Sequence, residues 1–199
     1  MVTARKLQAD STRKKLFAAA VQLFAAHGYH ATTVDAIARR VGVAKGTFFV
    51  HFPTKDAVIL RLLAVQTGAA RAARDAALGE GPHAALRAAV MTLSAQAGAS
   101  RELSRAVLAA TLDSAEVAHD ANALFGVVLD DMIVDARAAR ARDPERLARG
   151  LLAAYLGAAY HFAASRDSEG MTELVAPLVE ALLEQEGSRE AARRRRRRR

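Results

Sequence analysis

The sequence predicts an all-α protein with an N-terminal three-helix helix-turn-helix domain and a C-terminal helical bundle. Alanine, leucine and arginine dominate its 199 residues, and β-branched residues rarely alternate with polar ones. This composition favours helix over strand. The four prolines lie at positions 53, 82, 144 and 177, and the first three mark predicted helix starts. Apolar periodicity between these breaks predicts about nine helices.

Charge is distributed unevenly along the chain. Residues 1–60 carry nine Lys or Arg against three Asp or Glu, and residues 61–192 carry 13 against 18. Seven consecutive arginines at 193–199 supply most of the net charge of +8. A basic N-terminal segment followed by an acidic remainder indicates that the N-terminal segment binds a polyanion such as DNA. We expect a DNA-binding domain over 1–54, a helical ligand-binding and dimerisation domain over 55–187, and a disordered Arg-rich tail over 188–199.

The composition also argues against several classes of protein. The chain has no cysteine, which excludes disulfides and thiolate metal sites, and no His, Asp or Glu spacing matches another metal site. The N-terminus lacks an apolar stretch of signal-peptide length, and charged residues interrupt every apolar run before about 18 residues. We therefore expect a cytoplasmic protein with no membrane partner. No phosphate loop, nucleophile elbow or acid–base pair is evident, so we expect no cofactor and no enzyme activity.

The predicted helices follow one another with short connections. The first covers about 11–27 and ends at Gly28, the second begins at the capping pair Thr32-Thr33, and the third covers about 44–52. Thr54 caps a long helix that reaches about Leu78. Further helices are expected at about 83–97, 101–112, 117–141, 144–164 and 169–186, the last with a kink at Pro177 or a later start.

The most informative segment covers residues 32–56. Two short helices are joined there by a tight turn at Val41-Gly42-Val43, and glycine permits the sharp turn of a helix-turn-helix. A lysine, a glycine and a hydroxyl at the start of the second helix suit close approach to phosphates and base edges. The candidate DNA-binding residues are Thr33, Ala44, Lys45, Gly46, Thr47, Phe49, Val50, His51 and Lys55. The alternative is a three-helix bundle with a merely solvated basic face.

This segment closely resembles the DNA-binding domain of the TetR family of transcriptional regulators. The likeness runs from about Leu16 through Leu60 and includes LFAAHGYHATTV, DAIARRVGVAKGTFFVHF and PTKDAVI in the family's order and spacing. The resemblance implies that Lys45, Thr47, Phe49 and His51 meet the DNA backbone or base edges. It also implies a close approach at Gly46, a thymine-methyl contact at Val50 and phosphate contacts at Thr33 and Lys55.

Two residues depart from the family pattern. Ala44 stands where the family usually has a hydroxyl residue, and Phe49 stands where it usually has tyrosine. Each loss of a hydrogen bond costs on the order of 1 kcal/mol. The basic residues that precede the motif are expected to offset part of this cost by releasing counterions from DNA. They are Arg5, Lys6, Arg13, Lys14 and Lys15.

Beyond residue 60 the resemblance is architectural, and it implies a helical body that forms a homodimer and often encloses a small-molecule effector. The expected dimer interface comprises Leu151, Ala154, Ala158, Phe162, Leu178 and Leu182, with an intramolecular core as the alternative. The expected pocket comprises Met91, Leu108, Phe125, Met132 and Tyr155, although each of these also suits a plain core.

Four polar residues on the apolar helices of the body have no assigned role. Asp130, Asp131 and Asp135 are expected to face solvent, an arginine such as Arg105 or Arg137, or a cationic effector, and His161 is expected to be a packed histidine.

The resemblance implies a repressor that binds a near-palindromic operator in double-stranded DNA and is released by an effector. The alternative is a ligand-independent or architectural DNA-binding protein that uses the Arg-rich tail. The tail is also consistent with a simple solvated end.

Overall fold

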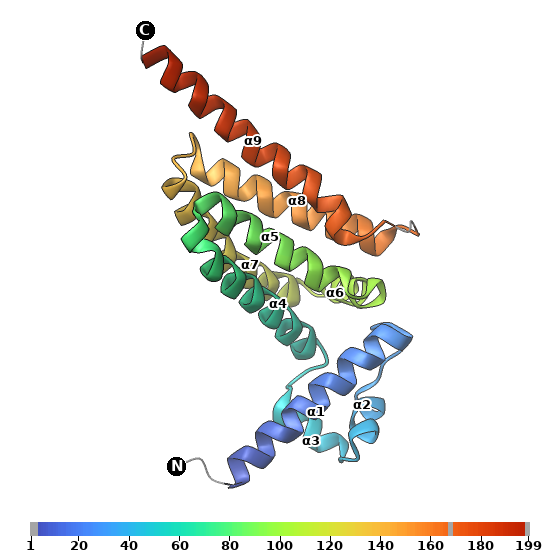
Figure 1. Cartoon of the computed structure of the whole chain (residues 1–199). Coiled ribbons are helices and arrows are strands. Elements are labelled where there is room, and N and C mark those ends of the chain that lie inside the picture. The colour runs from blue at the N-terminus through green and yellow to red at the C-terminus, as the bar shows by residue number, and fades with distance from the viewer. Residues whose placement is uncertain (1–3, 167–168, 198–199) are drawn as a thin grey trace. The chain divides into compact units, whose positions relative to one another are not determined.

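The computed structural model describes the backbone of residues 4–166 and 169–197, and the side chains of residues 6–166 and 169–185. The described residues form nine α-helices, one short 3₁₀ helix and no strand, which confirms the predicted fold class (Figure 1). The helices are α1 (Ala4–His27), α2 (Val34–Val41), α3 (Lys45–His51), α4 (Asp56–Ala77), η1 (Leu78–Glu80), α5 (Pro82–Gly98), α6 (Arg101–Asp113), α7 (Ala115–Ala138), α8 (Pro144–Ala164) and α9 (Met171–Arg197).

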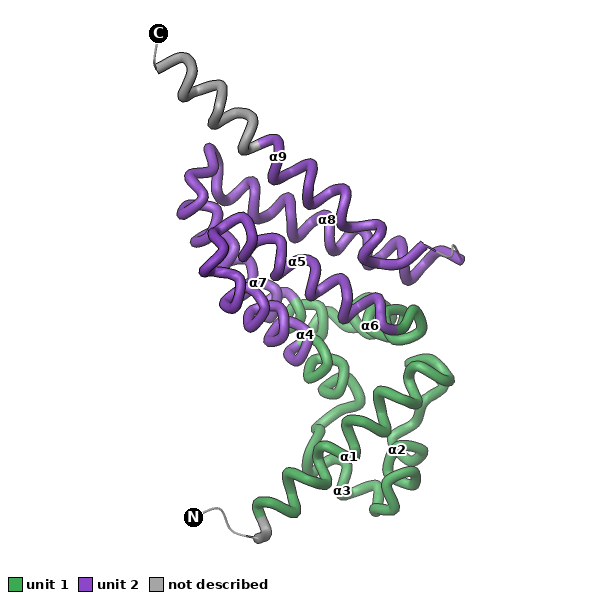
Figure 2. The backbone as a smooth tube through the Cα atoms, viewed as in Figure 1, with its two compact units in different colours: residues 1–63, 100–121 green, residues 64–99, 122–199 purple. Residues whose placement is uncertain are grey.

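The chain divides into two compact units (Figure 2). Unit 1 comprises Met1–Leu63 and Ser100–Ala121, and unit 2 comprises Ala64–Ala99 and Asn122–Arg199. The division therefore falls inside α4 and not at the expected boundary of 54/55. It also groups α6 with the N-terminal helices, because α6 packs against α1.

Unit 1 holds the helix-turn-helix on a small aromatic core. Phe24, Ile37 and Phe48 are fully buried, and the rings of Phe48 and Phe52 lie 5.6 Å apart. Each buried aromatic or aliphatic side chain contributes about 1.5–3 kcal/mol relative to an exposed one. This core fixes the crossing of α2 and α3 against α1.

The ends of α2 follow from two residues of the sequence. The Thr33 hydroxyl accepts a hydrogen bond from the Ala36 amide at 3.1 Å and caps the first turn. Gly42 ends the helix with a φ of +77°, in the left-handed region that favours glycine. The chain then turns into α3, as the spacing predicts.

Unit 2 is a helical bundle in which α8 and α9 pack against each other and α5 lies against both. The core draws on α4, α5, α7, α8 and α9 and includes the fully buried Leu86, Met132 and Leu151. At Gly98, an added Cβ would lie 2.9 Å from the Cβ of Met171. Glycine is therefore required where the end of α5 meets the start of α9.

A buried ion pair links α4 to α7 inside unit 2. The Arg74 guanidinium donates two hydrogen bonds of 2.7 Å to the carboxylate of Asp135, whose side chain is only 3% exposed. Arg71 donates to Asp131 at 2.6 Å one turn earlier. Both aspartates therefore face arginines, which was one of the expected alternatives, but the partners are Arg71 and Arg74 and not Arg105 or Arg137. The helices that meet are far apart in sequence, so helical spacing alone did not identify them.

The last helix is longer than the sequence predicts. α9 runs through Pro177, which is exposed, and its backbone stays helical to Arg197 where a disordered tail over 188–199 was expected. Alanine, glutamate and arginine are strong helix formers, which accounts for the extension. None of the described helices is long and apolar enough to span a bilayer.

Candidate DNA-binding surface

Helix α3 buries one side chain and presents most of the others. Phe48 is fully buried, whereas Val50 is 79% exposed and Phe49 is 45% exposed. Lys45 and Gly46 are exposed as well, while Thr47 and His51 are partly buried. Two large apolar side chains left in water on a firmly anchored helix indicate a contact surface for another molecule.

Gly46 lies on this exposed side of α3. A Cβ added there would meet no atom within 4 Å, and its φ is not in the left-handed region. Packing within the chain therefore does not require glycine at this position. Its effect is to keep the surface flat between Lys45 and Val50, which permits close approach of a partner's backbone.

The start of α3 lacks a side-chain cap. Ala44 occupies the capping position without a side-chain hydrogen bond, and only its carbonyl accepts from the Thr47 amide at 2.9 Å. By contrast, α2 has the capping hydroxyl of Thr33. The departure from the family pattern at Ala44 thus has a direct structural counterpart.

Lys45 and Thr33 are exposed and available to phosphates. The Lys45 ammonium lies 3.3 Å from the Asp35 carboxylate, with both side chains more than half exposed. An exposed pair of this kind is worth at most about 1 kcal/mol, so phosphate can displace Asp35 at little cost. Thr33 accepts a hydrogen bond at its cap, and its own O–H remains able to donate.

Lys55 is held within unit 1. Its ammonium donates to the carbonyls of Tyr29 at 2.8 Å and Thr32 at 3.2 Å, and lies 3.9 Å from the centre of the Tyr29 ring. Burial lowers the pKa of the Lys55 ammonium, although the charge of Asp113 opposes the shift. The expected phosphate contact would require these bonds to break. No sequence pattern predicts this internal role, because the partners of Lys55 are backbone carbonyls.

Next to Lys55, the pKa of Asp56 is raised above its ordinary value by burial and by the charges of Asp113 and Glu116. Asp113 also lies 3.4 Å from the His30 imidazole. The junction of the α1–α2 loop, the start of α4 and the end of α6 is therefore a cluster of charged groups inside unit 1.

Helix α1 adds positive charge. Lys6, Arg13, Lys14 and Lys15 are exposed, and the Arg13 guanidinium lies 5.6 Å from the centre of the Phe52 ring. The side chain of Arg5 lies outside the described residues. These cations share unit 1 with α3 and favour a polyanionic partner.

The expected pocket residues are divided between the two units. Leu108 is a partly buried residue of α6 in unit 1, and the other four are in unit 2. Met132 and Tyr155 belong to the unit 2 core, and Met91 and Phe125 pack against it. The rings of Phe125 and Tyr155 lie 5.9 Å apart, and burial raises the pKa of Tyr155 to about 12.

Half of the expected dimer residues lie in the core of a single chain. Leu151, Ala158 and Phe162 are buried in the unit 2 core, so they cannot form an intermolecular face without unfolding it. Ala154 is partly buried, Leu182 packs against the core, and Leu178 is 48% exposed. The error arose because α8 is apolar around most of its circumference.

The exposed side of α8 carries a different set of residues. Leu156 is 42% exposed and Tyr160 is 59% exposed, and Ala153 and Gly157 lie on the same side. His161 is exposed as well, which corrects its assignment as a packed histidine. No group of three or more His, Asp or Glu side chains among the described residues could hold a metal ion.

Comparison with known proteins agrees with the N-terminal geometry. Residues 16–62 match the family model described as bacterial regulatory proteins, tetR family. The HTH-type regulator TcmR of Streptomyces glaucescens is 48% identical over 56 residues, which cover 28% of this chain and 24% of that protein. The uncharacterised HTH-type regulator YuxN of Bacillus subtilis is 40% identical over 50 residues, covering 25% and 17%.

A solved structure is similar to this chain over most of its length, including the C-terminal helices. Thermus thermophilus FadR, a TetR-family transcriptional repressor in complex with lauroyl-CoA, is 26% identical with a TM-score of 0.66. The likeness covers 86% of this chain and 93% of that one. The sequence matches themselves span less than a third of the curated relatives described above. Residues 16–62 therefore match the DNA-binding segment of the tetR family of bacterial regulatory proteins, and the helical fold is similar to that of a TetR-family repressor.

Proposed function

We propose that this protein is a DNA-binding transcriptional repressor that is released from a near-palindromic operator by a small-molecule effector. The observation that carries the proposal is the exposed side of α3, where Lys45, Gly46, Phe49 and Val50 surround a helix anchored by the buried Phe48. Inserted in a major groove, Val50 and Phe49 would contact a thymine methyl and sugar, and Lys45 would meet phosphate.

The experiment compares two glycine variants on duplexes from the region flanking the protein's own gene. Gly46→Glu places a carboxylate on the exposed side of α3, and we expect it to lower affinity at least a hundredfold by repelling phosphate. Gly68→Glu is the matched control, because Gly68 is an exposed helical glycine of α4 with equally open space around it. Equal affinity of the two variants in fluorescence anisotropy would contradict the proposal.

The proposed repressor acts as a homodimer through the exposed side of α8 together with Leu178 of α9. Leu156, Tyr160 and Leu178 supply exposed apolar surface, and Gly157 permits a second helix to approach closely. A dimer places two α3 helices in successive major grooves, about one helical turn apart.

Leu156→Arg tests this face, and we expect it to convert the dimer to a monomer in light scattering. Leu112→Arg is the matched control, since Leu112 of α6 is 73% exposed and lies outside the proposed face. A dimeric Leu156→Arg protein would exclude this side of α8 as the interface.

The proposed effector enters the apolar interior of unit 2 beside Phe125 and Tyr155. The Tyr155 hydroxyl is protonated at neutral pH, as it is for any tyrosine, so it can donate a hydrogen bond to an effector's oxygen. Lauroyl-CoA, the ligand of the Thermus relative, is the first compound to titrate against the protein–DNA complex. Effector coupling of the usual size weakens DNA binding about 5–150-fold, and unchanged affinity would exclude this acyl thioester.

A further inference from the structure

Two polar side chains lie in the interior of unit 2. Gln66 of α4 is 6% exposed and Tyr155 of α8 is 3% exposed. Neither the Gln66 amide nor the Tyr155 hydroxyl forms a hydrogen bond with another of the described residues. By contrast, the buried Ser94 hydroxyl donates to the Val90 carbonyl at 2.8 Å. Buried polar groups are normally hydrogen-bonded, so the first two groups point to a partner that the chain itself does not supply.

The Gln66 amide and the Tyr155 hydroxyl also border open space. Among the described residues, no side-chain nitrogen or oxygen is both fully enclosed and without a hydrogen-bond partner. These two unpartnered groups therefore keep a small contact with space that water can enter, although the rest of each side chain is covered. A ligand of matching chemistry can displace water from such a space.

Helical register places the two side chains at one level of the bundle. The two ion pairs between α4 and α7 join residues 60 and 61 positions apart, so these helices run in the same direction. The same offset brings Gln66 level with the turn of α7 that contains Phe125, whose ring lies 5.9 Å from the Tyr155 ring. Ala70, one turn after Gln66, belongs to the same buried core as Tyr155. Gln66 and Tyr155 therefore lie in one layer of unit 2.

The charged groups around this layer are paired with one another. Arg71 and Arg74 of α4 are paired with aspartates of α7, and Arg87 of α5 is paired with Glu180 of α9. A charged ligand group brought beside Gln66 would lack a counterion. An unpaired buried charge costs far more than a neutral hydrogen bond returns, so the layer favours a neutral group.

We propose that Gln66 and Tyr155 form the polar part of the effector site, and that the part of the effector bound there is neutral, mainly apolar and carries a carbonyl, as in an amide, ester or thioester. The Tyr155 hydroxyl and the Gln66 NH₂ group donate to the carbonyl oxygen, and the Gln66 oxygen accepts from the N–H of an amide. Phe125 and Met91, which pack against the core, contact the apolar frame. This inference rests on the proposed effector response and names the chemistry that the effector must have.

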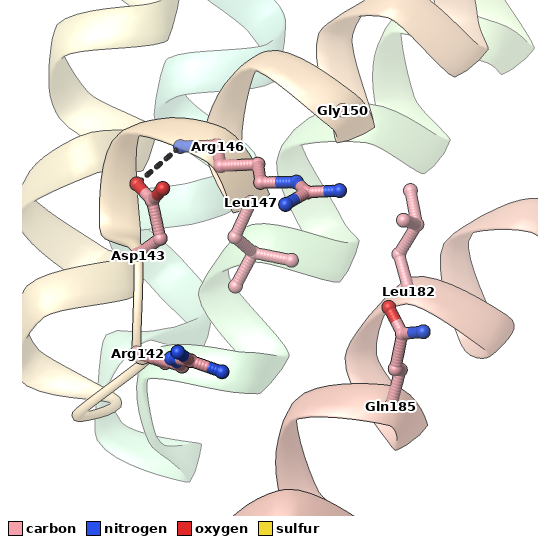
Figure 3. Close-up of a pocket in the computed structure, with 7 residues that line it drawn as sticks. All are labelled: Arg142, Asp143, Arg146, Leu147, Gly150, Leu182 and Gln185. Atoms are coloured by element: carbon pink, nitrogen blue, oxygen red, sulfur yellow. Dashed lines mark hydrogen bonds between the residues drawn. The ribbon is translucent and has the colours of Figure 1, made fainter.

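A groove between α8 and α9 is the alternative place for a small ligand (Figure 3). It has a volume of about 380 Å³, with Arg146 on its α8 side and Gln185 on its α9 side. Neither Gln66 nor Tyr155 lines this groove. An anion would favour the groove because of the Arg146 guanidinium, so the charge of the ligand distinguishes the two places.

The test titrates the full-length protein, without DNA, by calorimetry. The probes are hexanamide, octanamide and decanamide, with the carboxylates and alkylammonium ions of the same chain lengths, all below their micelle concentrations. Gln66→Met removes the amide with little change of shape, and Tyr155→Phe removes only the hydroxyl. The matched control is Gln96→Met, because Gln96 is an exposed glutamine of α5 in the same unit. Arg146→Gln tests the groove.

We expect an amide of this series to bind, and to bind more tightly than either ion of the same length. Gln66→Met and Tyr155→Phe each weaken that binding about two- to tenfold, the size of one neutral hydrogen bond. Gln96→Met and Arg146→Gln leave it unchanged. Without ligand, the thermal midpoints of Gln66→Met and Tyr155→Phe do not fall, since no hydrogen bond within the chain is lost.

Several results would overturn the inference. No amide binds, or a carboxylate or ammonium ion binds more tightly than the amide of its length, or Gln66→Met and Tyr155→Phe bind the amide as the parent does. A lower thermal midpoint in both variants would make the two groups structural and also overturn it. Binding weakened by Arg146→Gln but not by Gln66→Met assigns the probe to the groove, with the same consequence.

Release of operator DNA by the amide is measured separately by anisotropy. Amide binding that depends on Gln66 but releases no DNA contradicts the proposed effector response and leaves the site in place. Release by a compound whose binding is insensitive to Gln66→Met and Tyr155→Phe contradicts the site and leaves the effector response in place. The two proposals therefore fail in different ways.

Discussion

The two units use the same residue types in opposite ways. In unit 1, Phe49 and Val50 stand in solvent on α3, and the Lys45–Asp35 pair is open to water. In unit 2, Phe162 and Leu151 are buried in the core, and the Arg74–Asp135 pair is almost fully enclosed. These groups of α3 and its neighbour α2 are thus available to a partner, whereas those four residues of unit 2 hold its own helices together.

The largest expected effect comes from breaking the enclosed pair. Asp135→Asn leaves the Arg74 charge without its carboxylate, and we expect a loss of about 3–5 kcal/mol in the free energy of unfolding. Asp131→Asn is the matched control, because its partner Arg71 is half exposed and such pairs contribute about 0–1 kcal/mol. Urea unfolding measures both. Equal losses would mean that enclosure does not distinguish the two pairs.

Adjacent phenylalanines of α3 provide the next comparison. Phe48→Ala removes a fully buried ring and should lower the free energy of unfolding by about 3–5 kcal/mol. Phe49→Ala removes a half-exposed ring and should change it by less than about 1 kcal/mol while weakening operator binding about fivefold. If Phe49→Ala destabilised the fold as much as Phe48→Ala, the exposed side of α3 would be a packing surface instead.

A smaller effect concerns the uncapped start of α3. Ala44→Ser supplies the missing hydroxyl, and we expect it to raise stability by about 1 kcal/mol through capping. The same hydroxyl can donate to phosphate, so operator affinity should also rise, by up to about fivefold. Thermal melts and anisotropy measure the two effects. A rise in stability with no gain in affinity would place residue 44 outside the DNA contact.

The smallest effect is pH-dependent. Because folding raises the pKa of Asp56 above 3.8, its charged form costs stability at neutral pH, and the cost disappears as the pH falls through the raised pKa toward 3.8. Asp56→Asn should therefore stabilise the protein by on the order of a few tenths of a kcal/mol at pH 7. The gain should shrink as the pH falls toward 3.8 and vanish below that value in parallel urea titrations. A gain that is constant with pH would exclude the carboxylate charge as its cause.

The helix-turn-helix could be predicted from the sequence because its determinants are local. Gly42 and the Thr33 cap act within a few residues of their positions, and the buried Phe48 follows from helical spacing. The ends of α5, α6 and α8 were likewise predicted to within a residue or so, since Pro82, Ser100 and Asp143-Pro144 mark their starts.

Unit 2 was harder to predict because its ion pairs and packing contacts join segments that are distant in the sequence. Arg74 and Asp135 lie 61 residues apart, and no local pattern connects them. On α8, Leu151 and Leu156 are both apolar, yet one is in the core and the other is exposed. Periodicity assigns residues to sides of a helix, but only the neighbouring helices decide which side is covered.

The placement of lysine has a consequence for chemical footprinting. All five lysines of the chain lie within its first 55 residues, and every later cation apart from histidine is an arginine. Four of them are exposed, whereas the Lys55 amine is bonded to the carbonyls of Tyr29 and Thr32. Amine-directed reagents will therefore label the exposed four readily, and a bound polyanion will shield them. Lys55 will react only when the loop after α1 opens, which makes its acetylation rate a reporter of motion at that junction.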